Sequence, residues 1–425
     1  MVYENTEKSY LPDTMFKVTK TLYLEAPPHH AVYAQHQTYI GREGAELIEA
    51  VRHEARGEVP GVGPRYYAPL IYRRRSLDNG RTWARDGEPW VQSPATLVGP
   101  DRRFTPQYYH DPDLGITLSM FLVYDVLLAQ AGRRERFSDE GVDGDTRRMF
   151  YSLSRDGGRT WDEPRQMIHS GAAYDAAHWG PGLFYGKTGG GGDLVHFHKL
   201  KDGTLVSGMT VNLQDGKRFQ CLLVRARWKP DLSGLDWEFS EYISMRPDES
   251  SQGCCEAMPA VLDDGRIFMS LRCCGDRETK KFPSLKYWVI SDDGGRTFSH
   301  PKPLAYENGN PVWSPSSFAG IIRSSRNGKF YWIGNILSEP TYTSQPRYPL
   351  CIAELVPERG CLARDSVAVI DTRPPDCREE RRRYTNFGFY EDRLSGEIVV
   401  TLPEQPRLDW SDFTSDCYSY RVSVD

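Results

Sequence analysis

The sequence predicts an all-β fold of the propeller class, because one short pattern recurs along the chain. The pattern, S-x-D-x-G-R-T-[WF], occurs at Ser76–Trp83, Ser154–Trp161 and Ser291–Phe298. A strand-like run precedes each copy, and long β-rich stretches separate the copies. A strand–turn–strand unit that returns at intervals is typical of propeller blades arranged around one axis.

Each residue type in the pattern has a role in a hairpin turn. The aspartate side chain accepts hydrogen bonds from backbone N–H groups one or two residues further on. Glycine supplies the positive φ that other residues avoid, and the terminal aromatic side chain buries a large apolar face. We therefore expect Asp78, Asp156 and Asp293 to stabilise the fold rather than to carry chemistry.

Weaker turns set the expected number of blades. Degenerate copies near Asp231–Trp237 and Pro357–Gly360 bring the number of blade turns to about five. Hairpins with a central glycine at 201–206, 263–269 and 394–400 fit the inner strands of blades. The chain termini are left to complete one more blade. We therefore expect a six-bladed propeller, with seven blades as the alternative.

One propeller domain is expected to span residues 1–425, since blades add laterally around a single axis. The charged, glycine-containing segment 131–148 is predicted to be an exposed insertion. Residues 43–55 show some helical periodicity, but the repeat predicts a strand there. The glycine run 189–192 precedes neither Lys-Ser/Thr nor a helical pattern, so it does not indicate a phosphate loop, and no cofactor is expected.

Composition narrows the classes of partner. The chain has 38 glycines, 29 prolines and 24 tyrosines, as expected for an all-β protein with many turns. A net charge of -5 and the lack of a basic stripe argue against a nucleic-acid partner. No apolar run of about 18 residues occurs, so no membrane partner is expected. The N-terminus lacks a basic segment followed by an apolar core, which favours a cytoplasmic location, although a secreted mature form stays open.

Cysteines and histidines were considered as metal ligands. The chain has nine cysteines, and the pairs Cys254-Cys255 and Cys273-Cys274 lack the spacing of a metal finger. We expect reduced thiols on neighbouring strands. His196 and His198 are two residues apart, so on a strand both side chains face one way. A third ligand is not evident, and no metal site is predicted.

The repeated pattern resembles the Asp-box of the sialidase (neuraminidase) superfamily, where it joins the two outer strands of a blade. The resemblance extends to residues that follow the family's order along the chain, namely Glu256, Arg272, Arg347, Tyr384 and Glu404. It implies that Tyr384 is the nucleophile and that Glu256 takes its proton. It also implies that Arg272 and Arg347 hold the substrate carboxylate and that Glu404 orients an arginine.

The chemistry of these residue types is consistent with that set. Arginine forms bidentate pairs with carboxylates, so clustered arginines imply an anionic substrate. A neutral phenol is a suitable nucleophile where the reacting carbon already carries a carboxylate, and sialidases are the tyrosine exception among glycosidases. We therefore expect an exo-acting glycosidase whose partner is an acidic oligosaccharide or glycoconjugate. The oligomeric state is not predicted.

Two parts of the family pattern are missing. Sialidases begin with an Arg-Ile-Pro strand, whereas this chain has Ala31–Gln37, with Ala34 or Gln35 in place of the arginine. The acid/base aspartate that precedes the first Asp-box is also absent from Arg56–Tyr67. His36 lies on the first expected inner strand, and histidine is a common general acid/base. We therefore name His36 as a candidate catalytic group.

Two other functions remain open on these residues. Some uronate lyases resemble this protein in having propeller folds. They use histidine and tyrosine as base and acid and arginine to neutralise the carboxylate, and this chain contains all three residue types. A glycan-binding propeller without catalysis is the third hypothesis, because two catalytic parts are missing. A lyase would release an unsaturated uronate that absorbs in the ultraviolet, and a hydrolase would not.

Overall fold

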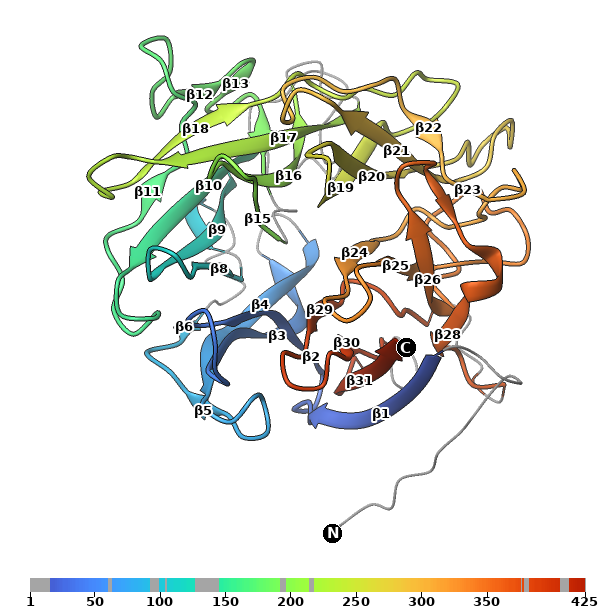
Figure 1. The fold of residues 1–425 in the computed structure, drawn as a ribbon, viewed down its shortest axis with the longest axis horizontal. Helices are drawn as coiled ribbons and strands as arrows, with labels where there is room; N and C mark the ends of the chain where they lie inside the picture. Colours follow the sequence, from blue (N-terminus) through green and yellow to red (C-terminus); the bar gives the residue numbers. More distant parts are fainter. Residues whose placement is uncertain are drawn as a thin grey trace.

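The computed structural model describes residues 16–59, 63–91, 99–103, 105–126, 145–191, 196–213, 218–375, 377, 382–405 and 413–424. Strands make up nearly all of the regular structure in these ranges, beside the short 3-10 helix η3 (Arg364–Ser366). The sheets are arranged around a common centre, as in a propeller (Figure 1). The all-β class predicted from the sequence is therefore confirmed. Among the described residues, no helix has the length and apolarity needed to cross a bilayer.

The first sheet contains the first repeated turn. Its strands are β2 (His30–Tyr39), β3 (Leu47–Val59), β4 (Gly63–Ser76), β5 (Ala84–Arg85) and β6 (Trp90–Val91). The repeated pattern joins β4 to β5, as the hairpin interpretation requires. Of residues 43–55, which carry the helical periodicity, residues 47–55 lie in β3, as the repeat predicted, whereas 43–46 precede the strand.

A ten-stranded sheet follows and consists of two four-stranded antiparallel runs connected through β14. The first run is β8 (Gln107–Asp111), β9 (Ile116–Val126), β10 (Asp145–Ser154) and β11 (Arg165–Gln166), with β7 (Gly99–Arg103) also on β9. The second is β15 (His198–Lys199), β16 (Leu205–Asn212), β17 (Phe219–Trp228) and β18 (Leu235–Phe239), with β14 (Gly189–Gly190) between β10 and β16. A separate ribbon is formed by β12 (His178–Gly180) and β13 (Leu183–Phe184).

The remaining sheets complete the circle. One contains β19 (Cys254–Val261), β20 (Ile267–Cys273), β21 (Lys286–Ser291) and β22 (Lys302–Pro303). The next contains β23 (Ala305–Tyr306), β24 (Gly320–Arg323), β25 (Phe330–Asn335), β26 (Leu350–Val356), β27 (Cys361–Leu362) and β28 (Ala368–Asp371). The last contains β29 (Gly388–Glu391), β30 (Ile398–Pro403), β31 (Cys417–Val424) and β1 (Phe16–Leu24).

Closure depends on β1, the first strand of the chain. It pairs antiparallel with β31, with Phe16 opposite Val424 and Leu22 opposite Tyr418 (Figure 1). Because β1 is the outer strand of the last sheet, the two ends of the chain share one sheet and the circle is held by its hydrogen bonds. The two chain ends therefore complete one sheet, as the sequence indicated.

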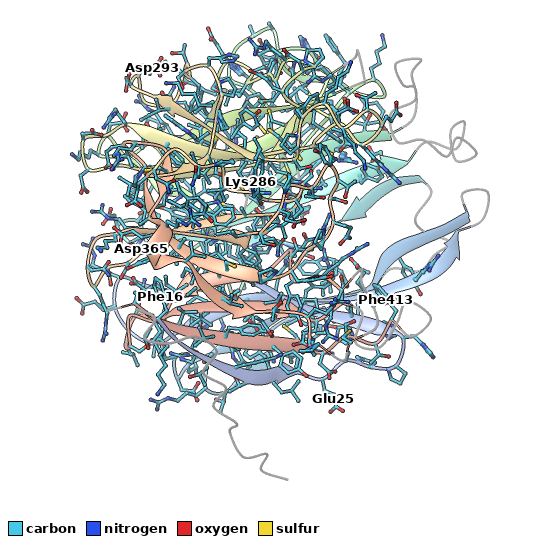
Figure 2. All side chains as sticks on the ribbon, turned by 90° about the vertical axis from the view of Figure 1, so that its right-hand side faces the viewer. Phe16, Glu25, Lys286, Asp293, Asp365 and Phe413 are labelled. Atoms are coloured by element: carbon cyan, nitrogen blue, oxygen red, sulfur yellow. The ribbon has the colours of Figure 1, made fainter. Side chains whose placement is uncertain are left out.

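The repeated turn has the predicted hydrogen bonds. Asp156 accepts from the backbone N–H groups of Arg159 (3.0 Å) and Thr160 (2.9 Å) and from the Thr160 hydroxyl (2.6 Å). The Thr160 hydroxyl, followed by the backbone donors, holds the pKa of Asp156 below its ordinary value. Asp293 makes the same contacts and lies at the outside of the molecule (Figure 2). These aspartates therefore fix turns, as expected.

The predicted insertion at 131–148 is described only in part. Residues 131–144 lie outside the described residues. Residues 145–148 form the start of β10, where they pair with residues 123–126 of β9, and the Thr146 side chain is buried. At least this end of the segment therefore belongs to the sheet, because a charged sequence can still alternate between two faces of a strand.

Candidate active site

Glu256 and Arg272 form an ion pair between neighbouring strands. Arg272 Nη1 donates to Glu256 Oε1 at 2.5 Å, from β20 to β19. In the regular ladder Arg272 lies opposite Cys255, so the next residue would point to the other face of the sheet. The register shifts between Cys255 and Met258, and Glu256 has a φ of 49°. This β-bulge brings the glutamate to the side of the arginine.

Two further arginines lie with this pair. Arg347 is in the connection between β25 and β26, and Arg383 precedes β29; the two segments run parallel and form an isolated bridge. Burial, followed by the charges of Arg272 and Arg383, lowers the pKa of Arg347 to about 10, although Glu256 opposes the shift. The structure therefore brings Arg272, Arg347 and Glu256 together and adds Arg383, while the roles expected of these residues stay predictions.

A third group of side chains comes from the first sheet. Tyr33 of β2 lies opposite Arg52 of β3, whose guanidinium stacks 4.3 Å from the centre of the phenol ring. Arg52 also pairs with Glu54 at 3.4 Å. Burial and then Glu54 raise the pKa of Tyr33, while Arg52 and Arg383 oppose the shift. Tyr33 also acts electrostatically on Arg347, which connects this group to the other arginines.

These residues are called the arginine cluster here: Arg52, Arg272, Arg347 and Arg383 with the carboxylates Glu54 and Glu256. Within this set, four guanidinium groups stand beside two carboxylates. Guanidinium groups match carboxylates in bidentate geometry, so a set of this kind is chemically able to hold an anionic ligand. Four residues of this region were not predicted as site residues, because they lie outside the motif positions that the resemblance selects: Arg52, Arg383, Tyr33 and Glu54. The run Arg381–Arg383 was the only signal for Arg383.

His36 lies in a second β-bulge, where the register of β2 shifts between Gln35 and Thr38 and φ is 61°. Burial, followed by Arg52, lowers the pKa of His36 to about 3. Its Nδ1 atom is buried and has no hydrogen-bond partner among the described residues. An imidazole with this pKa is neutral near pH 7 and is a weak base, because a catalytic base works best with a pKa near the working pH.

Tyr384 has different partners from those that the resemblance implies. Its side chain is 1% exposed, and its hydroxyl donates to Thr372 O at 2.9 Å and accepts from Arg382 Nε at 3.1 Å. Burial, followed by the charges of Glu404 and Asp371, raises the pKa of this phenol. The Tyr384 hydroxyl is thus bonded to Thr372 and Arg382, and activation of this phenol by Glu256 stays a prediction.

Glu404 belongs to the same buried network as Tyr384. It accepts from Arg382 Nη2 and from Lys20 Nζ, and it is 8% exposed. Lys20 comes from β1 and also binds Asp371 at 2.8 Å, so the network ties the first strand to the last two sheets. The arginine that Glu404 contacts is Arg382, and its role in orienting an arginine for substrate stays a prediction.

His196, two residues before His198, lies near His36. Burial, followed by His198 and His36, lowers the pKa of His196 to about 3, and its ring packs 4.3 Å from that of Phe389. Burial also lowers the pKa of His198 to about 4. In the part of the chain that the structure describes, no group of three or more His, Cys, Asp or Glu side chains is arranged to hold a metal ion.

Comparison with known proteins places the fold. No protein-family model and no curated protein matches the chain. A protein of unknown function from Dyadobacter fermentans is 16% identical with a TM-score of 0.60, covering 96% of this chain and 99% of that one. The NanB sialidase of Streptococcus pneumoniae is 13% identical with a TM-score of 0.56, covering 95% and 70%.

An α-L-arabinanase of Penicillium chrysogenum, solved with arabinobiose, is 15% identical with a TM-score of 0.54, covering 95% of this chain and 97% of that one. Likeness at this level of identity shows the fold alone. The chain therefore has a propeller-like fold of the kind found in sialidases and in an arabinanase.

Proposed function

We propose that the protein is an exo-acting glycoside hydrolase that acts on a sugar bearing a carboxylate. The observation that carries the proposal is that Arg272, Arg347 and Arg383 come from three separate segments, with Arg272 paired to Glu256 and Arg383 beside Arg347. An anionic ligand bound among these guanidinium groups would be attracted by all three, because opposite charges attract over such distances. A substrate carboxylate is the group that such a cluster binds best.

We further propose that the sheets form six blades. The four-stranded runs begin at β2, β8, β15, β19, β24 and β29, and β1 supplies the outer strand of the last run. A blade of four antiparallel strands is the usual unit of a propeller. In this arrangement the arginine cluster draws on the first, fourth, fifth and sixth blades.

For the reaction we assign the phenol to Tyr33 rather than to Tyr384. The Tyr33 phenol interacts electrostatically with the guanidinium groups of Arg347 and Arg383 and with the carboxylate of Glu54. A phenol–carboxylate couple therefore lies within the arginine cluster. In this proposal Tyr33 attacks the anomeric carbon, Glu54 takes its proton, and Arg347 binds the substrate carboxylate. Glu256, held by Arg272, serves as acid and base for the leaving oxygen.

Fluorogenic glycosides test the proposal. The protein is incubated with 4-methylumbelliferyl glycosides of N-acetylneuraminic, glucuronic and galacturonic acid, and with the neutral arabinofuranoside as a control. Release from at least one acidic substrate, lost in the Arg347→Ala variant and kept in Arg159→Ala, is the expected result. Release from the neutral substrate alone would contradict the acidic specificity.

A uronate lyase is the second candidate, and one observation favours it. His36 has a buried Nδ1 atom without a hydrogen-bond partner among the described residues and lies near Arg52, and a substrate carboxylate bound to Arg52 would offset the positive charge that weakens this base. The reaction would generate an unsaturated uronate, so ultraviolet absorbance during incubation with uronic-acid oligosaccharides distinguishes it from hydrolysis. Binding of acidic sugars without either product would identify a glycan-binding propeller instead.

A further inference from the structure

A buried lysine lies directly beside the arginine cluster. Lys286 begins β21 and is the cross-strand partner of Arg272 in β20, so two cations stand side by side on one face of the sheet. The Lys286 side chain is fully buried and lies in the interior of the molecule (Figure 2). Its Nζ donates to Pro315 O at 2.9 Å and to Ser317 O. Both of these acceptors are backbone carbonyls rather than carboxylates.

These two carbonyls flank the residue that holds Arg272. Ser316 Oγ accepts from Arg272 Nε at 3.0 Å. By fixing the backbone on both sides of Ser316, Lys286 fixes the position of the hydroxyl and therefore the orientation of the guanidinium. A lysine with two converging acceptors is well suited to this task, because its ammonium group has three donors.

The same network extends to Arg347. Ser317 Oγ donates to Asn335 Oδ1 at 2.8 Å, and Asn335 Nδ2 donates to Pro349 O and Tyr384 O, each at 3.1 Å. The Tyr384 N–H in turn donates to Arg347 O at 2.9 Å. Lys286 is thus connected through buried polar groups both to the side chain of Arg272 and to the backbone of Arg347.

Because charged groups surround Lys286, the protonation state of its amine depends on whether a charged ligand is bound nearby. The groups that act on it are Arg272 and Cys273 from β20, and Glu256 and Cys255 from β19. The 314–317 segment on its other side contributes only serine and proline. Burial, followed by Arg272, lowers the pKa of Lys286 to about 7, while Glu256 opposes the shift. An anion bound to Arg272 and Arg347 would add negative charge close to this amine.

We propose that Lys286 is a positioning residue for the arginine cluster. We also propose that Lys286 takes up a proton when an anion binds to the cluster. The inference rests on the proposed function only in requiring that the cluster bind an anion. By linkage, a ligand that favours the protonated amine binds more tightly where the amine is protonated. Anion affinity therefore falls as the pH rises through neutrality, on the order of tenfold between pH 6 and pH 8.5.

Calorimetric titration tests the inference with N-acetylneuraminate, glucuronate and sulfate as probes. Each titration is repeated near pH 7.5 in two buffers of different ionisation enthalpy, which yields the number of protons taken up. The wild-type protein is expected to take up a fraction of a proton per anion. Lys286→Met should bind more weakly, without that uptake and with a flat pH profile, whereas Lys329→Met, at an exposed lysine, should behave as wild type.

A second variant separates positioning from charge. Ser316→Ala removes the hydroxyl that holds Arg272 but leaves the lysine, so affinity should fall several-fold while proton uptake is kept. If Lys286→Met does not fold, as judged by circular dichroism, Lys286→Arg replaces it and should bind with a flat pH profile, because arginine does not titrate in this range.

The outcomes distinguish the two proposals. If the wild-type protein binds a probe with no proton uptake, or if the folded Lys286 variants keep the wild-type uptake, the inference on Lys286 is wrong and the proposed function stands. If the wild-type protein binds none of the probes at any pH, the cluster is not an anion site and both proposals fail.

Discussion

Arg272 donates to Glu256 Oε1 at 2.5 Å, although its partner in the β-ladder is the preceding residue, Cys255. The bulge that places Glu256 on the side of the arginine has a left-handed φ, a conformation that costs a glutamate of order 1 kcal/mol or more. Strain of this kind persists where the surrounding structure holds it, and it is frequent at functional sites. This pair is the part of the arginine cluster with the best-defined geometry.

Replacement of Arg347 by alanine is expected to separate function from stability. The variant should weaken acidic-ligand binding by about 10- to 100-fold, because a charged hydrogen bond to the ligand contributes about 1.5–3 kcal/mol. The free energy of unfolding should stay constant or rise, because the repulsion from Arg272 and Arg383 is relieved. Calorimetry and urea denaturation measure the two effects; a large loss of stability would indicate a structural role instead.

The two tyrosines should respond differently to phenylalanine. Tyr384→Phe leaves Thr372 O and Arg382 Nε without the hydroxyl, so stability should fall by about 1–3 kcal/mol. Turnover per folded molecule should be unchanged. Tyr33→Phe should lower turnover at least 100-fold, because it removes the proposed nucleophile. The reverse pattern in a fluorogenic assay would restore Tyr384 as the nucleophile.

Acid should destabilise the protein through its buried histidines. The folded-state pKa values of His36 and His196 are lowered to about 3, and that of His198 to about 4, against 6.5 for the free group. The unfolded chain therefore binds more protons below pH 6.5, so stability is full above that pH and is lost as the pH falls toward 4.

The loss expected for each buried histidine is up to about 1.4 kcal/mol per pH unit. Urea denaturation of His196→Gln at several pH values should give a flatter profile between pH 6.5 and 4. The matched control is His300→Gln, at an exposed histidine, which should follow the wild-type curve. Parallel curves for His196→Gln and wild type would show that this histidine is already protonated in the folded state.

Alkaline conditions should stabilise the protein through Lys286. Its folded-state pKa is lowered from 10.5 to about 7, so between these values the unfolded chain holds a proton that the folded protein has released. The free energy of unfolding should therefore rise with pH in this window, by up to about 1.4 kcal/mol per unit. The difference between wild type and Lys286→Met, measured at pH 7 and pH 9, isolates this contribution. An equal response of both proteins would refute it.

Two adjacent glycines in the third repeated turn provide a test of packing. Gly294 and Gly295 both have positive φ, 73° and 83°. A methyl group at Gly294 would meet its nearest atom at 3.8 Å, whereas at Gly295 it would lie 2.2 Å from Leu223 Cδ2. Gly294→Ala should cost about 1 kcal/mol from backbone strain, and Gly295→Ala a further 1–3 kcal/mol from overpacking. Equal melting temperatures for the two variants would contradict this reading.

Local chemistry made the turns and the sheets predictable. Within the pattern Ser154–Trp161, Asp156 accepts from Thr160 and the Gly158 N–H donates to Ser154 Oγ, so the hairpin follows from sequence alone. The resemblance to a family pattern selected Glu256, Arg272 and Arg347; the first two lie on adjacent strands of one sheet, and Arg347 lies in the connection between β25 and β26 of the next sheet.

Long-range geometry decided the rest. Neighbouring residues on an extended chain point to opposite sides, so a shift of one position placed Arg383 in the arginine cluster and Tyr384 in the network with Arg382 and Glu404. The bulge at Glu256 likewise depends on contacts between sheets. The sequence by itself therefore determined the propeller-like fold, whereas only the tertiary structure decided which side chains face one another, because packing between distant strands sets their register.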